Sequence, residues 1–245
     1  MHPILFELGP LRFYSYGLLI AIGFLAANSL AARRAAALGL EPARVQGIAL
    51  TALAAGLVGG RLGYVLFQWE LFRNNPLEIF RLDHGGLVFF GGFAGGIAGA
   101  VWAIRRAGLP VARTVDLLVP PLAVAHAFGR VGCFLNGCCY GKVTSLPWGV
   151  RFPSDGLRRH PTQLYEMLAL LAIFLLLKRI ERGDPRPGTV LLSYGASYGL
   201  WRFLVEFLRG DNPPFALGLT VFQWVGLALA GVSAVLLASR CRRNA

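Results

Sequence analysis

Seven apolar stretches, separated by short polar segments, divide the chain. They run over approximately residues 16–32, 46–67, 86–104, 115–135, 162–177, 188–208 and 220–239. The segments between them carry the prolines and charges typical of turns. A bilayer core about 30 Å thick needs roughly 20 apolar residues per helix. The pattern therefore predicts an all-α integral membrane protein with seven transmembrane helices, forming a single transmembrane domain over residues 1–245.

The composition agrees with this pattern. Of the 245 residues, 56% are hydrophobic and only 15% are charged, and the mean hydropathy is +0.58. A soluble domain is about one quarter charged and less than half apolar. The composition therefore argues against a soluble protein, and it also excludes a disordered chain or a small disulfide-rich scaffold.

The charge is strongly positive, with 24 Lys and Arg residues against 12 Asp and Glu. In a soluble protein this balance would suggest nucleic acid. Here the arginines are divided among short loops and apolar stretches, which favours anionic lipid, and we expect no nucleic-acid partner. Thirteen Lys and Arg residues lie on one set of helix ends and eight on the other. The positive-inside rule then places the N-terminus outside, the C-terminus inside and a small loop region, residues 136–161, on the extracytoplasmic side.

Five charged residues lie inside or at the edge of apolar stretches: Arg61, Arg130, Glu166, Arg202 and Glu206. Each costs a few kcal/mol or more in a bilayer, so each should face a partner or a water-filled cavity. Arg202 and Glu206 are four residues apart and share a helix face. Taken alone, this pair is explained as well by a structural ion pair that joins helices as by a functional role. Three arginines against two carboxylates, however, predict an excess of positive charge that favours an anionic lipid headgroup.

Residues 129–141 are the densest candidate stretch, with four glycines in thirteen residues. Glycines weaken a helix, so they predict either a close backbone approach or a break. Helix packing through small residues explains the glycines. It does not explain Arg130 and Asn136, which favour a binding site.

The chain contains four cysteines: Cys133, Cys138, Cys139 and Cys241. Their spacing is not that of a known zinc site and no nearby histidine completes one, so we expect no metal. An extracytoplasmic loop would permit a disulfide, although Cys138 bonded to Cys139 would be strained. We interpret each as a small buried hydrophobic residue.

Several motifs, in order along the chain, carry a family resemblance. They are Tyr14-Ser15-Tyr16-Gly17, Gly59-Gly60-Arg61-Leu62-Gly63-Tyr64, the run from His84 to Gly92, the stretch 129–141, the run from His160 to Glu166 and the run from Tyr198 to Arg209. From residue 1 to about 240 the chain resembles the prolipoprotein diacylglyceryl transferases. The seven-helix, N-out arrangement of that family agrees with the topology predicted above.

The resemblance implies a transferase of the bacterial cytoplasmic (inner) membrane that acts in the first step of lipoprotein maturation. It would move the diacylglyceryl group of phosphatidylglycerol to the lipobox cysteine of a preprolipoprotein, forming a thioether and releasing glycerol phosphate. A thiolate is the nucleophile, and the site must stabilise charge on the departing phosphate. Clustered arginines serve this purpose, and no cofactor is expected.

The family's site residues carry over by position. Arg130 matches the signature arginine and is expected to hold the lipid phosphate. Asn136 and Gly141 match further signature positions. Arg202 matches the arginine assigned to catalysis, and Glu206 is expected to orient it.

Further matches lie outside the signature. Tyr16 matches the essential tyrosine of the first helix, and Arg61 and Arg209 are expected to support the binding of phosphatidylglycerol. Three residues near position 160 either build the outer wall of the site or brace a loop where a helix begins: His160, Gln163 and Glu166.

The chain departs from the family pattern at two places. Phe90 stands where the family often has histidine, and Cys133 and Cys138 stand where it often has asparagine and glutamate. A base at position 90 is therefore absent. One of three histidines substitutes for it: His84, His126 or His160. Otherwise the arginines lower the pKa of the substrate thiol and no base is needed. His126 lies four residues before Arg130, on the same helix face.

Two alternatives to the transferase remain. The loss of the histidine at position 90 is compatible with an inactive or repurposed phosphatidylglycerol-binding paralogue. A transporter or scramblase of anionic lipid is the other alternative. It would favour broken helices in paired halves of the chain, and the sequence contains no such repeat.

Overall fold

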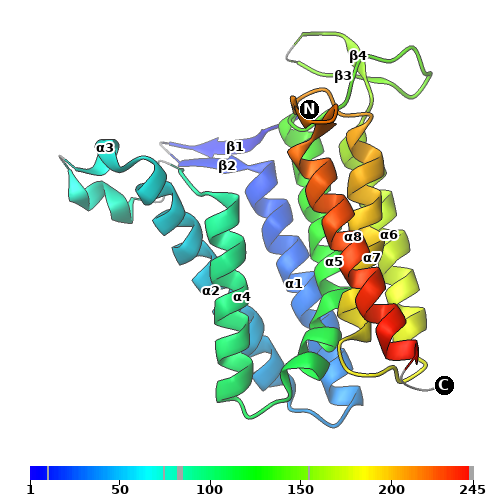
Figure 1. Ribbon diagram of the computed structural model, residues 1–245. Helices are drawn as coiled ribbons and strands as arrows, with labels where there is room; N and C mark the ends of the chain where they lie inside the picture. Colours follow the sequence, from blue (N-terminus) through cyan, green and yellow to red (C-terminus); the bar gives the residue numbers. More distant parts are fainter. Residues whose placement is uncertain (10, 74, 82–84, 154, 243–245) are drawn as a thin grey trace. The chain divides into compact units, whose positions relative to one another are not determined.

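A computed structural model describes residues 1–9, 11–73, 75–81, 85–153 and 155–242. The fold is helical, and these ranges contain seven helices of 18 or more residues (Figure 1). They are α1 Ser15–Ala37, α2 Pro42–Phe67, α4 Phe89–Arg106, α5 Val111–Asn136, α6 Thr162–Glu181, α7 Thr189–Glu206 and α8 Val221–Arg242. A short α3, Trp69–Phe72, and a 3-10 helix, Pro76–Phe80, follow α2.

Three two-stranded antiparallel hairpins complete the described structure. They pair β1 Ile4–Leu8 with β2 Leu11–Tyr14, β3 Val150–Arg151 with β4 Arg158–Arg159, and β5 Pro214–Ala216 with β6 Leu219–Thr220. The hairpin β1–β2 precedes α1, and β5–β6 connects α7 to α8. None joins another into a larger sheet, so the helices determine the architecture.

Each apolar stretch of the sequence corresponds to one long helix, which confirms the all-helical prediction. In the described part of the chain, four helices are long and apolar enough to cross a membrane: Ser15–Ala37, Pro42–Phe67, Val111–Asn136 and Val221–Arg240. Helix α1 continues beyond its predicted end at residue 32 because nothing in the run to Ala37 interrupts a helix, and Arg34 lies in its last turn. A basic side chain at that end also interacts favourably with the helix dipole.

The chain forms two compact units. The first comprises residues 1–30 and 115–245 and the second residues 31–114. In the second unit, α2 and α4 approach closely through glycines. A Cβ atom on Gly59 would lie 2.4 Å from the carbonyl oxygen of Gly91. Only a residue without a side chain permits this backbone approach, which is typical of helix pairs in membranes.

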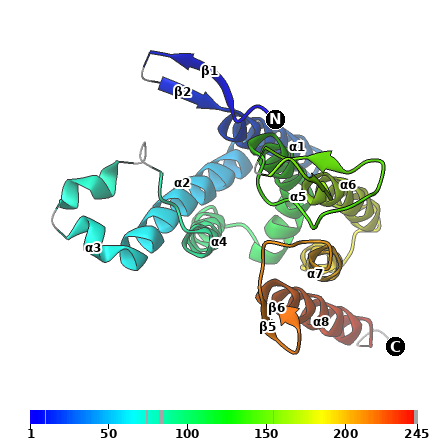
Figure 2. The same ribbon diagram turned by 90° about the horizontal axis from the view of Figure 1, so that it is seen from above.

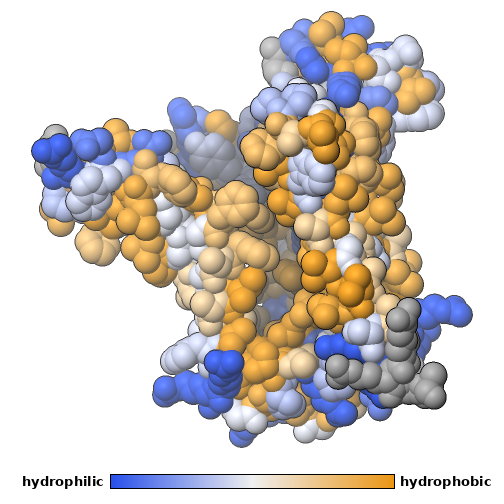
Figure 3. All heavy atoms as spheres, in the orientation of Figure 1, coloured by the Kyte–Doolittle hydropathy of each residue, from blue (hydrophilic) through white to orange (hydrophobic). Residues whose placement is uncertain are grey.

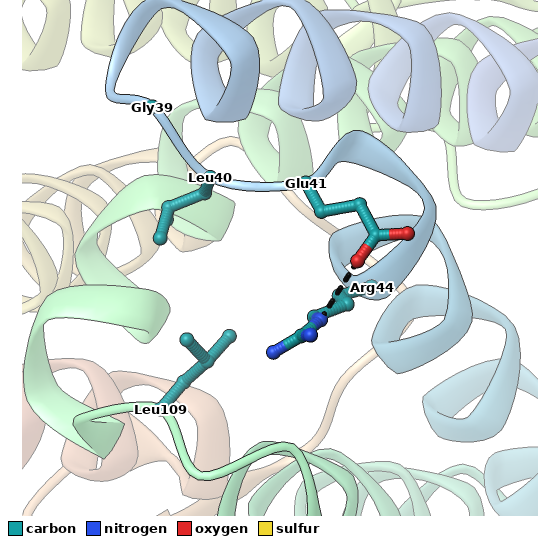
Figure 4. Close-up of a pocket in the computed structure, with 5 residues that line it drawn as sticks. All are labelled: Gly39, Leu40, Glu41, Arg44 and Leu109. Atoms are coloured by element: carbon teal, nitrogen blue, oxygen red, sulfur yellow. Dashed lines mark hydrogen bonds and ion pairs between the residues drawn. The ribbon is translucent and has the colours of Figure 1, made fainter.

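The second unit also contains a hollow of about 260 Å³ (Figure 4). Its lining comes from the α1–α2 and α4–α5 connections and includes an ion pair in which Glu41 and Arg44 are 2.9 Å apart. The remaining lining residues are Gly39, Leu40 and Leu109. No residue predicted for the functional site lines this hollow.

In the first unit, α7 lies between α8 and the pair α5 and α6 (Figure 2). The α7–α8 contact again depends on glycine, because a Cβ atom on Gly199 would lie 2.7 Å from the carbonyl oxygen of Gly226. Asp116 of α5 fixes the start of α7 by accepting hydrogen bonds from the backbone N–H groups of Gly188, at 2.5 Å, and Leu191, at 2.9 Å. These contacts hold α7 against α8 and against α5.

The outer faces of α7 and α8 are apolar (Figure 3). Val232 and Val235 of α8 are more than half exposed, and Leu200 of α7 is also exposed. Hydrophilic residues gather instead over the β3–β4 hairpin at one end (Figure 3). A helix pair with an apolar exterior is suited to a lipid environment.

Candidate active site

The candidate site lies where α5 ends and α6 begins. Gly137 follows the last residue of α5 and has a φ of +74°, a conformation that glycine adopts readily and that ends the helix. The first turn of α6 then holds the returning chain. Thr162 Oγ1 donates a hydrogen bond to the carbonyl of Cys139 at 2.8 Å, and Gln163 Nε2 donates to the carbonyl of Cys138 at 2.5 Å. Of the two roles expected for Gln163, the contact supports bracing of the loop.

Glu166, one turn further along α6, binds Arg130. The Glu166 side chain is 1% exposed, and its Oε1 lies 2.8 Å from Nη2 of Arg130. The same oxygen accepts a hydrogen bond from the hydroxyl of Tyr198 at 2.9 Å and lies 3.9 Å from Nε2 of His126. Arg130 Nε is buried and finds no acceptor among the described residues. One edge of the guanidinium is therefore fixed while a second donor remains free for a ligand.

Arg202 and Glu206 form the second charged pair. Nη1 of Arg202 lies 2.6 Å from Oε2 of Glu206, which confirms the pairing predicted from their spacing on one helix. The other oxygen of Glu206 accepts hydrogen bonds from Asn212 Nδ2, at 2.6 Å, and Thr220 Oγ1, at 2.9 Å. The Arg202 guanidinium also lies 4.8 Å from the centre of the Phe222 ring, a favourable cation–π distance. Arg202 is thus held from two sides.

The two pairs share one electrostatic environment. Both Arg130 and Arg202 lie within electrostatic range of His126 and of Tyr198. His126 Nδ1 is 3.3 Å from the hydroxyl of Tyr194, whose ring stacks on that of Tyr198. The two tyrosines were not predicted. Tyr194, Tyr198 and Arg202 follow one another at intervals of four residues. This spacing is the sequence signal that could have found the tyrosines, because it places all three residues on one helix face.

Tyr16 and Asn136 border the same end of the unit. Gly132 of α5 permits Tyr16 to approach, because a Cβ atom on Gly132 would lie 3.0 Å from Tyr16 Cδ2. Asn136 is exposed and lies in hydrogen-bonding range of the Cys138 sulfur. The stretch 129–141 therefore contains both of the predicted glycine effects, a close approach at Gly132 and a helix end at Gly137.

Gly141 lies at a crowded crossing between the loop and the end of α7. A Cβ atom there would lie 2.6 Å from the carbonyl oxygen of Leu208 and 2.7 Å from the Cβ of His160. Its N–H donates to the carbonyl of His160 at 2.8 Å, and its backbone forms a bridge with Arg209. Arg209 itself is 9% exposed and forms an ion pair with Asp211. The structure thus brings Gly141 and Arg209 together, next to the Arg202–Glu206 pair.

Comparison with known proteins identifies the family of the chain. The sequence model of the prolipoprotein diacylglyceryl transferase family matches residues 3–239. The chain belongs to this family. A relative from Clostridium tetani is 38% identical over 93% of both chains. One from Geobacter sulfurreducens is 40% identical over 89% of this chain and 85% of its own. Both are named phosphatidylglycerol–prolipoprotein diacylglyceryl transferase.

The environment of Arg61 differs from that of Arg130 and Arg202. It belongs to the second unit, is 7% exposed, and directs its N–H groups at five backbone carbonyls. Those carbonyls belong to Glu78, Ile79, Arg81, Gly85 and Gly86, at 2.5 to 3.1 Å. The carbonyl dipoles stabilise its charge and all five donors are occupied. Arg61 is therefore stabilised by backbone carbonyls, whereas Arg130 and Arg202 are each paired with a carboxylate.

The family's histidine position is occupied by a surface residue of the second unit. Phe90 lies in the first turn of α4, is 66% exposed, and packs against Phe89 edge to face. Two other predicted residues, His84 and the side chain of Cys241, lie outside the described residues. His160 Nδ1 is 3.3 Å from the hydroxyl of Tyr165. Of the two candidate substitutes that the structure describes, His126 is the one beside Glu166.

The three cysteines of this signature are half-buried and free. Their sulfur atoms all lie within 4.8 Å of one another. Hydrogen bonds from Cys133 and Cys138, followed by the charges of Arg209 and Arg130, lower the pKa of Cys139. From the sequence we interpret each cysteine as a separate small hydrophobic residue. The fold brings their sulfur atoms together.

Proposed function

We propose that this chain transfers the sn-1,2-diacylglyceryl group of phosphatidylglycerol to the thiol of a lipobox cysteine in preprolipoproteins. The names of the relatives given above state a diacylglyceryl transfer between phosphatidylglycerol and a prolipoprotein. The observation that carries the proposal is Arg130, whose Nη2 is bound by a buried carboxylate while its buried Nε has no partner among the described residues. A phosphodiester supplies the acceptor that such a donor requires.

The two arginines have separate tasks in this proposal. Arg130 binds the lipid phosphate, and Glu166 positions its guanidinium. Arg202, positioned by Glu206, stabilises the negative charge that grows on the phosphate as it departs. Preorganised donors aimed at developing charge are the largest single contribution in many enzymes. Tyr16, Asn136 and Gly141 border the headgroup, and Arg209 supports this end of the site through its contact with Gly141.

The reaction is a substitution at carbon. The cysteine sulfur forms a C–S bond to the glyceryl carbon that carries the phosphate, and the C–O bond to the phosphate breaks with both electrons leaving on oxygen. The thiol proton is transferred in turn to the glycerol phosphate product. His126 is the proton acceptor that we assign, since its Nε2 lies 3.9 Å from the Glu166 carboxylate, which stabilises a protonated imidazole. If the arginine charges alone ionise the thiol, His126→Gln will leave the pH–rate profile unchanged.

We also propose that all seven long helices span the bacterial cytoplasmic membrane, with the N-terminus outside and the loop 136–161 extracytoplasmic. Helices α4, α6 and α7 are each 18 to 20 residues long, and they carry basic ends, glycines or the charges of the site. Intramembrane charges are tolerated when they are paired, as Glu166, Arg202 and Glu206 are. Labelling of single cysteines placed in each connection, with and without permeabilisation, tests this topology.

The test of the activity uses the purified chain, phosphatidylglycerol vesicles and a lipobox peptide, with mass spectrometry as the readout. We expect a diacylglyceryl adduct on the peptide cysteine, and a loss of at least 100-fold in rate for Arg130→Ala. Arg158→Ala is the matched control, because Arg158 is exposed on β4, and it should retain the wild-type rate.

Two results would refute the transferase. Binding of phosphatidylglycerol by the folded protein without an adduct would instead support a lipid-binding paralogue, as the phenylalanine at position 90 suggests. Flux of labelled lipid across a vesicle, again without an adduct, would support a scramblase.

A further inference from the structure

Three cysteine thiols gather where α5 ends. The Sγ atoms of Cys133, Cys138 and Cys139 lie within 4.8 Å of one another, and those of Cys138 and Cys139 are 3.7 Å apart. All three are free and half-buried. The proposed transfer reaction uses the thiol of the substrate and gives these three sulfurs no task.

The backbone is arranged so that the sulfurs converge. Cys133 lies in the last turn of α5, and after Gly137 the chain turns back so that the N–H of Cys138 donates to the carbonyl of Cys133 at 3.1 Å. Cys139 has a φ of +65°, which is uncommon for a residue with a Cβ atom. The hydrogen bond from Thr162 to its carbonyl holds it there. The loop is thus fixed from α6 as well as from α5.

The spacing fits a metal ion better than a disulfide. A metal about 2.3 Å from each sulfur requires the sulfurs to be about 3.8 to 4.0 Å apart, close to the distance between Cys138 and Cys139. A disulfide needs a separation of about 2.05 Å, with strain if it joins adjacent residues. Three sulfurs also exceed what one disulfide uses.

Charge favours a soft monovalent ion. Three thiolates with one such ion carry a net negative charge, and Arg130 and Arg209 both lie within electrostatic range of Cys139. Thiolates select copper(I), whereas zinc prefers four ligands, and the described residues offer three at this place. We propose that Cys133, Cys138 and Cys139 form a three-sulfur site for copper(I).

The test measures bound copper and does not depend on transferase activity. Full-length protein in detergent, fully reduced and kept anaerobic, is loaded with copper(I) and dialysed against a bicinchoninate competitor. We expect one copper per chain for the wild type and for Cys241→Ser, the matched control. Each single serine variant at the three sites should bind at least tenfold more weakly, and the triple variant should bind none. X-ray absorption should give sulfur neighbours at about 2.3 Å.

Several outcomes would overturn the copper site: no retained copper, equal retention by the triple variant, or preference for zinc in an equimolar mixture. A disulfide between Cys133 and Cys138 in protein purified without reductant, together with no copper binding after reduction, would do the same. If the triple variant does not fold, protection of the wild-type thiols from alkylation by copper decides the question. Failure here leaves the proposed transferase untouched, since no step of the transfer uses these thiols.

Discussion

Replacement of Glu166 by glutamine tests how the site holds its arginine. The carboxylate is 1% exposed, and it accepts contacts from Arg130 at 2.8 Å and from Tyr198 at 2.9 Å. Glutamine keeps the shape and an oxygen acceptor but removes the charge. Removing one member of a buried ion pair costs about 3–5 kcal/mol. The remaining neutral hydrogen bonds offset about 1 kcal/mol of this, so about 2–4 kcal/mol of the positioning of Arg130 is lost.

At about 1.4 kcal/mol per tenfold change in rate, this loss predicts a fall in kcat of about 30- to 700-fold. The KM for phosphatidylglycerol should stay near the wild-type value, because a guanidinium without its carboxylate still attracts the phosphate. Initial rates with the lipobox peptide measure both constants, and thermal unfolding in detergent shows whether the variant is folded. Glu166→Asp keeps the charge and should recover part of kcat.

The matched control is Glu70→Gln. Glu70 is 80% exposed and is paired with Arg73 at 3.3 Å. Such surface pairs contribute less than about 1 kcal/mol, so its rate should stay within about twofold of the wild type. A folded Glu166→Gln variant with more than half of the wild-type kcat would refute the positioning role. So would a rise in KM with kcat unchanged.

Three further predictions concern residues whose packing the structure defines. Arg61→Ala removes the side-chain hydrogen bonds to five carbonyls, of which that of Glu78 keeps the backbone N–H of Arg81 as a donor. We expect the free energy of unfolding to fall by at least about 3 kcal/mol in a denaturation experiment; Arg61→Lys should recover little, since an ammonium cannot reach all five. Gly59→Ala forces α2 and α4 apart and should cost about 1–3 kcal/mol of unfolding free energy, whereas Gly47→Ala in the same helix meets no atom within 4 Å and should be neutral or stabilising. Gly141→Ala collides with the carbonyl oxygen of Leu208 at 2.6 Å and should reduce the transfer rate at least tenfold, while Gly231→Ala, which meets nothing within 4 Å, should not; equal rates for these two variants would contradict the crowding argument.

Local features of this protein were accessible from the sequence. The seven apolar runs correspond to the seven long helices, because helix formation in an apolar run depends on residues close together in the chain. The Arg202–Glu206 pair was predictable for the same reason, since a spacing of four residues fixes the helix face. The glycines of residues 129–141 also predicted a close backbone approach or a helix break, and the structure has the first at Gly132 and the second at Gly137.

The tertiary structure alone decided which distant residues meet. Glu166 lies on a different helix from Arg130, and no periodicity in the sequence connects the two, so the sequence left Glu166 with a choice of roles at the edge of the site. Counting charges assigned Arg61 to the same group as Arg130, because a count cannot detect backbone carbonyls that a folded loop supplies. Nothing in the sequence indicated that the three cysteines form a cluster. Their sulfur atoms converge because the chain turns back at Gly137, after α5, and because Thr162 holds the loop by a hydrogen bond. Helix formation is local, whereas the packing of helix faces and loops depends on contacts between residues far apart in the chain.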